Sequence, residues 1–543
     1  MHFNLIVSSL LASVALADRS ACDASAIRVD TTTGLLVDAC GRQRIFRGIN
    51  SVRKGAPWIN DPSKYLPNGQ SLSDADALLF RSLGMNLVRL GIMWSGVSAV
   101  EGSPDAALLS EYAETSARLA TVGIRSLLDA HQDGFSPAFC DDGAPPWVAR
   151  ECAAGAPGFP EPLDTPFPVD NSTFTPTICS SPKVPAASWF EFYFTNAVGQ
   201  CFGALYNTTT PTNAAFRDFW VSVVKAYAAA SDGGLSILAY ELLNEPWAGD
   251  ALANPALLVP GVADSVELQP FYGSLTKAIR QAEAAAGMAS KIVSMEPVTW
   301  DDIFPVGFSN ASDAWPLSGL ELLSYHFYAL PDFQGSALQV SMRAADALRL
   351  GAAAILTEFD AGLVNPVNAP YGKLDMRATL NACEKARHGS IGWDYSCLQQ
   401  GGDGTTLHTE TVRELARPVP LALAGSGASE WRFDASDETA PRFNVTYVHE
   451  RAVSDRGGPS SIFLSTGLWF DAATLEVNVT STPPNAVTWT LDHSPGRVSL
   501  PAANETQIPA PDPLDYTLLT IVSAAGAPDT AVVTVSVSSG GRR

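Results

Sequence analysis

The sequence predicts an α/β protein that consists of a (β/α)8 barrel followed by a C-terminal antiparallel β-sandwich. Short apolar runs of β-forming residues recur eight times between residues 45 and 395, and helical stretches lie between them. Such runs are typical of parallel strands buried on both faces, and eight strand–helix alternations indicate a closed barrel. After about Leu423 the helical patterns end, and segments of alternating polar and apolar residues predict the sandwich.

The barrel elements are assigned in chain order. The predicted strands lie at residues 45–50, 86–92, 124–131, 237–246, 291–297, 321–328, 354–359 and 390–395. Helical patterns between them include residues 74–84, 108–123, 216–230 and 339–351. A doubly wound sheet also alternates strands with helices, but no glycine-rich phosphate-binding motif follows the first strand. We therefore expect a barrel domain over residues 18–423 and a β-sandwich over residues 424–543.

One connection of the barrel is unusually long. An insertion rich in Pro and Gly, at about residues 134–213, follows the third strand and contains four of the eight cysteines. In a barrel of this kind, the loop after a strand lies on the C-terminal, catalytic face. We expect the insertion to form a disulfide-linked rim over the active site.

The N-terminus and the cysteines predict an extracellular protein. An apolar run from Phe3 to Leu16 ends in Ala15-Leu16-Ala17, which is typical of a secretory signal peptide over residues 1–17. An even number of cysteines in an exported chain favours disulfides, and their spacing does not match a zinc site. We expect the pairs Cys22–Cys40 and Cys383–Cys397, and pairing among the remaining four, which are Cys140, Cys152, Cys179 and Cys201. Glycosylation sequons for a eukaryotic host lie at Asn171, Asn207, Asn310, Asn444, Asn478 and Asn504.

The charge of the chain excludes some partners. The sequence has 34 Lys and Arg against 56 Asp and Glu, for a formal net charge of -22. Binding to nucleic acid requires clustered cations that neutralise phosphates, so we expect no nucleic-acid partner. We expect a monomer.

Two glutamates stand at the ends of predicted strands. The fourth strand ends in Asn244-Glu245-Pro246, and the seventh ends in Thr357-Glu358-Phe359. A retaining glycosidase requires two carboxyl groups about 5–5.5 Å apart, one protonated and one ionised. This chemistry requires neither a metal nor an organic cofactor. Glu296, which ends the fifth strand, is the alternative carboxylate, and we expect it to line the pocket or support the reacting groups.

These motifs resemble glycoside hydrolase family 5 of clan A, and within it the branch of endoglycoceramidases and glucosylceramidases. The matching segments are RGIN (47–50), NLVRLGI (86–92), DAHQD (129–133), ELLNEPW (241–247), SYHFY (324–328) and LTEF (356–359). The resemblance implies that Glu245 is the acid/base and Glu358 the nucleophile. It also implies that Asn244 binds the sugar 2-hydroxyl and that Arg89 keeps Glu358 ionised.

Further residues are expected around the two glutamates. His131 and His326 should line the pocket and orient the carboxylates, and Tyr328, on the same strand face as His326, should bond Glu358. We also expect Trp393 to lie under the sugar ring and Lys54 and Asp133 to bind glucose hydroxyls. The alternatives are buried core positions for the histidines and Trp393, and surface charges for Lys54 and Asp133. Tyr325 and Phe327 should face the core.

The expected reaction is the hydrolysis of a β-glycosphingolipid between its sugar and ceramide by double displacement, with an acidic pH optimum. An apolar segment of the insertion, SWFEFYF at 188–194, could line a lipid groove, although a helix packed on the barrel explains it equally well. We also expect transient contact with a membrane or micelle surface. One alternative is a secreted β-glucanase or β-glucosidase that acts on polysaccharide or steryl glucosides. Another is an inactive carbohydrate- or lipid-binding protein.

Overall fold

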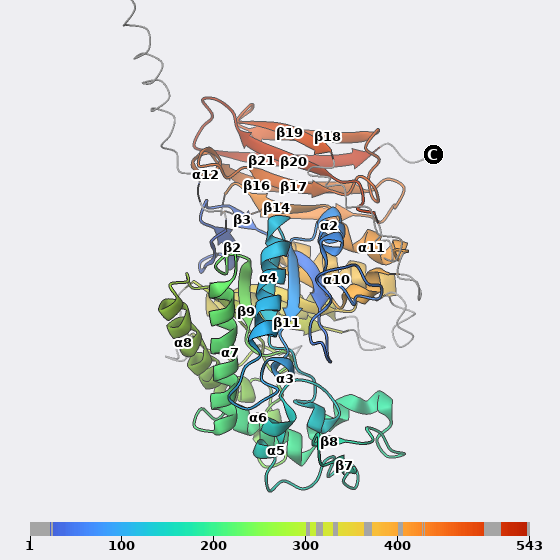
Figure 1. Ribbon diagram of the computed structural model, residues 1–543. Coiled ribbons are helices and arrows are strands. Elements are labelled where there is room, and N and C mark those ends of the chain that lie inside the picture. The colour runs from blue at the N-terminus through green and yellow to red at the C-terminus, as the bar shows by residue number, and fades with distance from the viewer. Residues whose placement is uncertain are drawn as a thin grey trace, which may run out of the picture.

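The computed structural model describes residues 22, 25–299, 304–310, 319–328, 335–362, 372–399, 406–425, 427, 429–493 and 512–539. The predicted signal peptide and the sequon at Asn504 lie outside these residues. Two parts are evident in Figure 1, a barrel surrounded by helices and a layered set of strands above it.

The predicted eight-stranded barrel is confirmed. Its parallel strands form a closed ring in the order β4, β5, β6, β9, β10, β11, β12 and β13, and β13 pairs with β4. Their bounds are Arg47–Ser51, Leu87–Gly91, Arg125–Asp129, Ile237–Glu241, Ile292–Met295, Glu321–Phe327, Ala353–Phe359 and Gly389–Gly392. Every residue of β4, β5, β9 and β12 is buried, which explains the apolar runs by which the strands were recognised.

Helices cover the outside of the barrel. The main ones are α2 (Asp74–Ser82), α4 (Ala106–Thr121), α7 (Pro211–Ala229), α8 (Gln269–Ala286), α9 (Ser336–Leu350) and α10 (Gly372–Ala386), with the shorter α3 (Trp94–Val97) and α11 (Thr409–Leu415). The four helices expected from periodicity are therefore present. Their apolar faces join the strands in one large core, which contains Phe80, Tyr112, Trp220 and Ile279.

The insertion after β6 forms the lower end of the molecule in Figure 1. Its elements are η1 (Pro137–Phe139), α5 (Pro146–Cys152), β7 (Val169–Asp170), β8 (Thr175–Pro176), η2 (Ala186–Phe194) and α6 (Asn196–Tyr206). Disulfides join Cys140 to Cys179 and Cys152 to Cys201, so the four middle cysteines pair among themselves as expected. Because the insertion follows the C-terminal end of a barrel strand, it lies on the face where barrel enzymes carry their active sites.

The C-terminal region consists of two antiparallel sheets. A four-stranded sheet contains, in order, β15 (Ser429–Asp434), β16 (Arg442–Glu450), β21 (Thr530–Ser539) and β18 (Leu475–Thr482). The larger sheet contains β1 (Ile27–Asp30), β2 (Leu35–Asp38), β3 (Gln43–Arg44), β14 (Val419–Leu423), β17 (Ser460–Leu464), β20 (Thr517–Ser523) and β19 (Val487–His493). A separate apolar core, which includes Phe443, Ile462, Ile521 and Val535, lies within this region.

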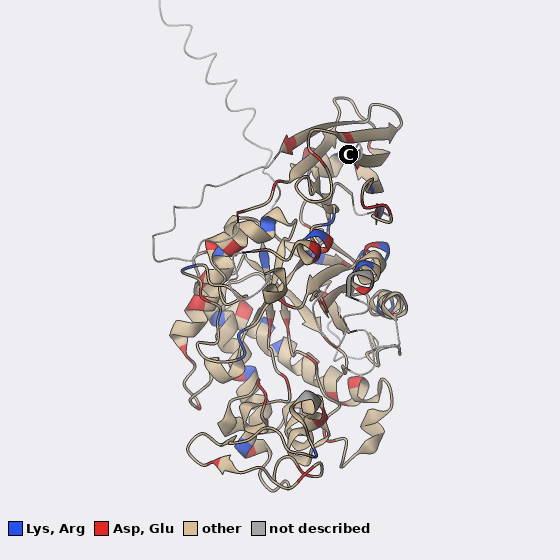
Figure 2. Ribbon diagram, turned by 90° about the vertical axis from the view of Figure 1, so that its right-hand side faces the viewer, with Lys and Arg blue, Asp and Glu red and all other residues tan. Residues whose placement is uncertain are grey.

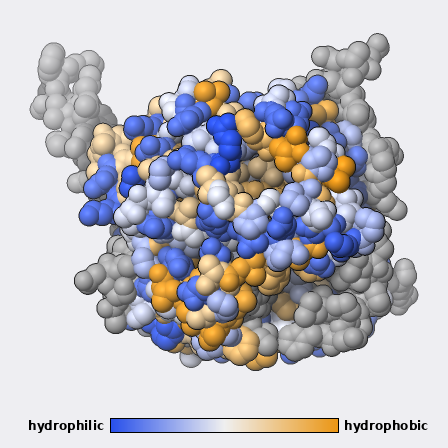
Figure 3. Space-filling view, turned by 90° about the horizontal axis from the view of Figure 1, so that it is seen from below, coloured by the Kyte–Doolittle hydropathy of each residue, from blue (hydrophilic) through white to orange (hydrophobic). Residues whose placement is uncertain are grey.

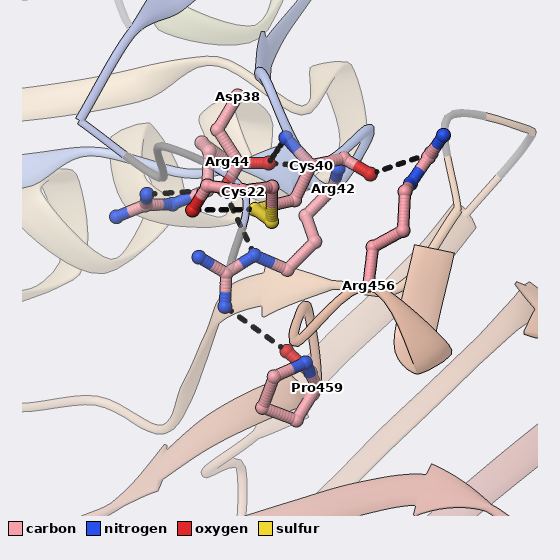
Figure 4. The surroundings of a disulfide bond; sticks show 7 residues. All are labelled: Cys22, Asp38, Cys40, Arg42, Arg44, Arg456 and Pro459. Carbon is pink, nitrogen blue, oxygen red and sulfur yellow. Dashed lines mark hydrogen bonds and ion pairs between the residues drawn. A yellow bond between two sulfur atoms is a disulfide. The ribbon is translucent and has the colours of Figure 1, made fainter. Parts of the chain in front are cut away.

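The N-terminal strands join the C-terminal sheet. β3 pairs with β14 through Arg44 and Ala422, although the sequence placed both segments within the barrel domain. The expected Cys22–Cys40 disulfide is present beside this junction (Figure 4). Near this disulfide, Arg42 donates to the carbonyl oxygen of Pro459 at 3.2 Å. The strands β1, β2 and β3 have only two to four residues each, which is too short for a recognisable pattern in the sequence.

The predicted disulfide between Cys383 and Cys397 is wrong, because both thiols are free. Cys383 lies on α10 before β13, whereas Cys397 lies in η5 (Tyr395–Leu398) after that strand. The four residues of β13 span about 13 Å at roughly 3.3 Å per residue. A disulfide tolerates a Cα separation of at most about 7 Å, so the strand keeps the two thiols apart.

Charged residues are interspersed along the helices and loops of both regions (Figure 2). Among the described residues, no helix combines the length and the apolar composition that crossing a membrane requires.

Candidate active site

The structure brings Glu245 and Glu358 together at the C-terminal face of the barrel. Glu245 follows β9, and Glu358 is the penultimate residue of β12. One carboxylate oxygen of Glu245 lies within 4.8 Å of one carboxylate oxygen of Glu358. The Nδ1 atom of His326 lies between them, 2.8 Å from Oε1 of Glu245 and 3.6 Å from Oε2 of Glu358.

Arg89 is the central cation of the site. It lies in the middle of β5 and is fully buried. Its Nη1 atom donates to Oε1 of Glu358 at 2.6 Å, and its Nη2 atom donates to Oδ1 of Asn244 at 2.6 Å. Two residues expected near Glu358 and the sugar are therefore held by one guanidinium group.

The remaining contacts of Arg89 involve residues that were not recognised from the sequence. Its Nη1 atom also donates to Oδ1 of Asn50 at 3.0 Å, and its Nε atom donates to the carboxylate of Glu241. Its Nη2 atom lies 3.2 Å from Oδ1 of Asp129. Asn50, Asp129 and Glu241 are polar residues at or next to the C-terminal ends of β4, β6 and β9, and this position is the signal by which the sequence could have identified them.

The surroundings of Glu358 favour a fixed, charged carboxylate. Arg89 binds one of its oxygens, and the hydroxyl of Tyr328 donates to the other at 2.7 Å. Burial raises the pKa of Glu358 above its ordinary value, and the positive charge of Arg89 opposes this shift. Since both hydrogen bonds favour the ionised form, this carboxylate is suited to nucleophilic attack.

Glu245 has different surroundings. Its side chain is 18% exposed, and its Oε1 atom lies 2.8 Å from Nδ1 of His326, whose own pKa is lowered by burial. Burial and the negative charge of Asp133 raise the pKa of Glu245 to about 7. A carboxyl group with this pKa stays protonated in mildly acidic solution and suits proton donation.

Glu296 contacts both Glu245 and His326. Its Oε2 atom accepts a hydrogen bond from the backbone N–H of Glu245 at 2.9 Å, and its Oε1 atom lies 3.5 Å from Nδ1 of His326. Burial and the charge of Glu241 raise its pKa well above the ordinary value. Because Glu296 is 2% exposed and bonded to the backbone, it lies behind Glu245 rather than beside the substrate space.

The other expected sugar-binding residues form one wall of the site. Trp393 directly follows β13 and is partly exposed, and its ring stacks on that of His131 at a centroid distance of 5.4 Å. The Nζ atom of Lys54 lies 5.2 Å from the centroid of the Trp393 ring and pairs with the carboxylate of Asp133. An aromatic face next to paired charges matches the apolar face and the hydroxyls of a pyranose.

His131 does not contact the two glutamates in the way expected. Its Nδ1 atom lies 2.8 Å from Oδ2 of Asp129, and its Nε2 atom lies 3.5 Å from Oδ2 of Asp133. It therefore supports the wall with Trp393 and Asp133, whereas His326 alone of the two histidines contacts Glu245.

Within the part of the chain that the structure describes, three groups of carboxylates and histidines have atoms close enough to share a cation. One consists of His131, Asp133 and Asp142, and here Lys54 already pairs with Asp133 and lies 3.7 Å from Asp142. The others consist of His326 with Glu245 and Glu358, and of His326 with Glu241 and Glu296. Arg89 supplies a positive charge to both of these groups through Glu358 and Glu241.

Comparison with known proteins adds the family. The model of the family described as "Cellulase (glycosyl hydrolase family 5)" matches residues 46–397, which cover the barrel and its active-site face. The chain belongs to glycoside hydrolase family 5. As a family 5 protein with both strand-end glutamates in place, it is a glycoside hydrolase.

Several proteins similar to this chain are endoglycoceramidases. The chain is 32% identical over 453 residues to an endoglycoceramidase of Hydra vulgaris, covering 82% of this chain and 81% of the relative. It is 32% identical over 477 residues to an endoglycoceramidase of Cyanea nozakii, covering 85% of this chain and 88% of the relative. The lactosyl-enzyme intermediate of endo-glycoceramidase II from Rhodococcus sp. shares the fold, with a TM-score of 0.64, 21% identity, and coverage of 93% of this chain and 99% of that chain.

Proposed function

We propose that this protein is a retaining β-glycosidase that hydrolyses the bond between the sugar and the ceramide of glycosphingolipids. The observation that carries the proposal is the pairing of Glu245 and Glu358 in a chain that is 32% identical to two endoglycoceramidases over most of its length. The relatives supply the substrate class, and the two carboxylates supply the reaction.

The first step is a displacement at C1 of the sugar. The Glu358 carboxylate attacks C1 while Glu245 gives its proton to the departing oxygen, which leaves as the ceramide hydroxyl. Arg89 and Tyr328 hold Glu358 by its two oxygens so that it faces the anomeric carbon. Asn244, whose amide oxygen is bound by Arg89, keeps its amide N–H groups for Gln132 and for the sugar 2-hydroxyl.

The second step releases the sugar. Glu245, now ionised, takes a proton from water, the water oxygen bonds to C1, and the bond between C1 and Glu358 breaks. The closeness of the glutamates supports this double displacement, because one oxygen of Glu245 lies within 4.8 Å of one oxygen of Glu358, and retaining enzymes hold their two carboxyl groups only about 5–5.5 Å apart. Inverting enzymes separate their carboxyl groups by about 6.5–9.5 Å to admit a water molecule.

An apolar surface near the active-site face supports a lipid substrate. Trp189, Phe190 and Phe194 of η2 have exposed fractions of 42%, 53% and 44%. Phe194 packs edge-to-face on Trp247, two residues after Glu245, with ring centroids 4.7 Å apart. In Figure 3, which shows the molecule from the end that carries the insertion, apolar patches lie among polar ones.

The exposed Phe194, packed on Trp247 two residues after the acid/base, suits the ceramide, because the leaving group departs on the side of Glu245. We extend the proposal to transient contact of this face with a membrane or micelle, from which the substrate would be taken. Secretion is a further part of the proposal, supported by three disulfides, which form in oxidising compartments. N-terminal sequencing of the exported protein should give Asp18 as its first residue, and an intact Met1 would contradict secretion through this signal.

A panel of glycolipids and polysaccharides tests the function. Purified protein is incubated with glucosylceramide, lactosylceramide, a ganglioside, a steryl glucoside and soluble β-glucans, and the products are identified by mass spectrometry. The proposal expects free ceramide together with the intact sugar from at least one glycosphingolipid, and none of either with Glu358→Gln. Turnover of β-glucan or steryl glucoside alone would support the alternative substrates, and no turnover of any glycoside would contradict the enzymatic proposal.

A further inference from the structure

Glu245 has a backbone conformation that residues with side chains rarely adopt. Its φ is +39°, in the left-handed region that favours glycine. A residue keeps such a conformation only where its surroundings fix it. The groups that hold the backbone of Glu245 therefore also determine where its carboxyl group points.

The side chain of Gln132 is one of these groups. It follows β6, is 4% exposed, and donates from Nε2 to the carbonyl oxygens of Asn244 at 2.8 Å and Glu245 at 3.0 Å. Its Oε1 atom accepts from the backbone N–H of Phe135 at 2.9 Å, which fixes the orientation of the amide. In return, Nδ2 of Asn244 donates to the carbonyl oxygen of Gln132 at 2.8 Å.

Glu296 holds the remaining polar group. The backbone N–H of Glu245 donates to its Oε2 atom at 2.9 Å. Because the next residue is Pro246, which has no N–H, the two peptide units that flank Glu245 carry three polar groups. Gln132 and Glu296, together termed the backbone clamp, bond all three of them.

We propose that Gln132 is a positioning residue that aims the carboxyl group of Glu245 at the glycosidic oxygen by holding the carbonyl groups on both sides of the left-handed turn. This inference rests on the proposed function, because it gives Gln132 a part only in those steps in which Glu245 transfers a proton. Gln132 itself has no bond to Glu358, whose contacts with Arg89 and Tyr328 come from other strands.

Two substrates with different leaving groups can distinguish a positioning role of Gln132 from a purely structural role. An alkyl β-glucoside, like a ceramide glucoside, leaves only if its oxygen is protonated, whereas a 2,4-dinitrophenyl β-glucoside leaves unaided. A misdirected acid therefore lowers kcat/KM for the alkyl glucoside and spares kcat/KM for the dinitrophenyl glucoside. With the dinitrophenyl substrate, kcat and KM should fall together, because loss of the base slows only the release of the sugar.

Two variants of Gln132 and one control test the inference. Gln132→Glu keeps the shape and the oxygen that binds Phe135, but it replaces the donating amide by an acceptor. Gln132→Met removes all the polar contacts. The matched control is Gln269→Met, because Gln269 is also 4% exposed and bonds the backbone of Ser309 through both amide atoms, at 2.6 and 3.0 Å.

The measured quantity is the ratio of kcat/KM for the alkyl glucoside to kcat/KM for the dinitrophenyl glucoside. This ratio does not depend on the folded fraction of a variant, because unfolded protein lowers both values equally. Since general acid catalysis contributes about 10²–10⁴-fold, both Gln132 variants should lower the ratio at least roughly tenfold. Gln269→Met should leave it unchanged.

An unchanged ratio in both Gln132 variants would overturn the positioning role, whether or not their overall activity falls. The reference is Glu245→Ala, which should lower the ratio further than either Gln132 variant. If Glu245→Ala leaves the ratio unchanged, or if the wild-type protein hydrolyses neither the two glucosides nor any glycosphingolipid of the panel, the proposed function itself fails. These results are distinct from a failure of Gln132 alone.

Discussion

Removal of the Tyr328 hydroxyl provides a narrow test of how Glu358 is kept ionised. In Tyr328→Phe, the carboxylate loses a 2.7 Å hydrogen bond to Oε2 and keeps its bond to Arg89. A hydrogen bond to a charged group contributes about 1.5–3 kcal/mol, which corresponds to roughly tenfold to 150-fold in rate. Because Tyr328 is 40% exposed, water can replace part of the bond, and we expect a loss at the lower end, about tenfold in kcat/KM.

The same change should alter the pH dependence. The hydroxyl favours the charged form of Glu358, so its removal raises the pKa of that carboxyl group. The acid limb of kcat/KM, which reports ionisation of the nucleophile in the free enzyme, should move upward by about one pH unit. The assay is hydrolysis of an aryl β-glucoside as a function of pH.

Tyr325, which lies on β11 three residues before Tyr328, supplies the control. The hydroxyl of Tyr325 bonds Nδ1 of His388 at 2.7 Å, and Tyr325 is buried, as expected from the alternation of β11. Tyr325→Phe should cost about 1 kcal/mol of stability and leave the acid limb in place. The reasoning is refuted if Tyr328→Phe retains the wild-type acid limb, or if both variants shift it alike.

Three further predictions concern the proton donor, the buried cation and the insertion. Because burial raises the pKa of Glu245 to about 7 and the acid must be protonated, kcat/KM for an alkyl glucoside should fall above about pH 7; a level profile to pH 9 would contradict this role. Arg89→Met leaves buried carboxylates without their cation and should lower the free energy of unfolding, measured in urea, by about 3–5 kcal/mol, whereas the exposed Arg432→Met should change it by less than about 0.5 kcal/mol. Replacing Cys152 and Cys201 by serine opens a loop with a sequence separation of 49 and should lower the free energy of unfolding by up to about 4 kcal/mol. Limited proteolysis should then cut first within residues 134–213. Unchanged resistance of this segment to the protease would contradict the prediction.

Hydrophobic periodicity was sufficient to predict the barrel, because strands buried on both faces have a composition that does not depend on distant parts of the chain. The predicted ends were less accurate. The fourth strand was expected over residues 237–246, but β9 ends at Glu241, four residues before the left-handed turn at Glu245. The pairing of the N-terminal strand β3 with β14 was not predictable, because the two strands are almost 400 residues apart in the sequence.

The candidate site was predictable where it depended on strand ends and on alternation along one strand. Glu245, Glu358 and Tyr328 were placed near each other in this way, and the structure brings them together. The roles of Asp129 and Glu241 were not predictable, because their contacts with Arg89 depend on the register between neighbouring strands of the closed barrel. The clamp formed by Gln132 and Glu296 depends on the same register.

The most direct test of the central claim is to identify the residue that carries the glycosyl group during the reaction. A 2-deoxy-2-fluoro β-glucoside with a good leaving group forms the glycosyl-enzyme quickly and releases it slowly, so the intermediate can be digested and sequenced by mass spectrometry. The proposed mechanism predicts a single fluoroglucosyl group on Glu358, and none in Glu358→Gln. A label on Glu245 or Glu296, or hydrolysis of an aryl glucoside with inversion at the anomeric carbon, would contradict it.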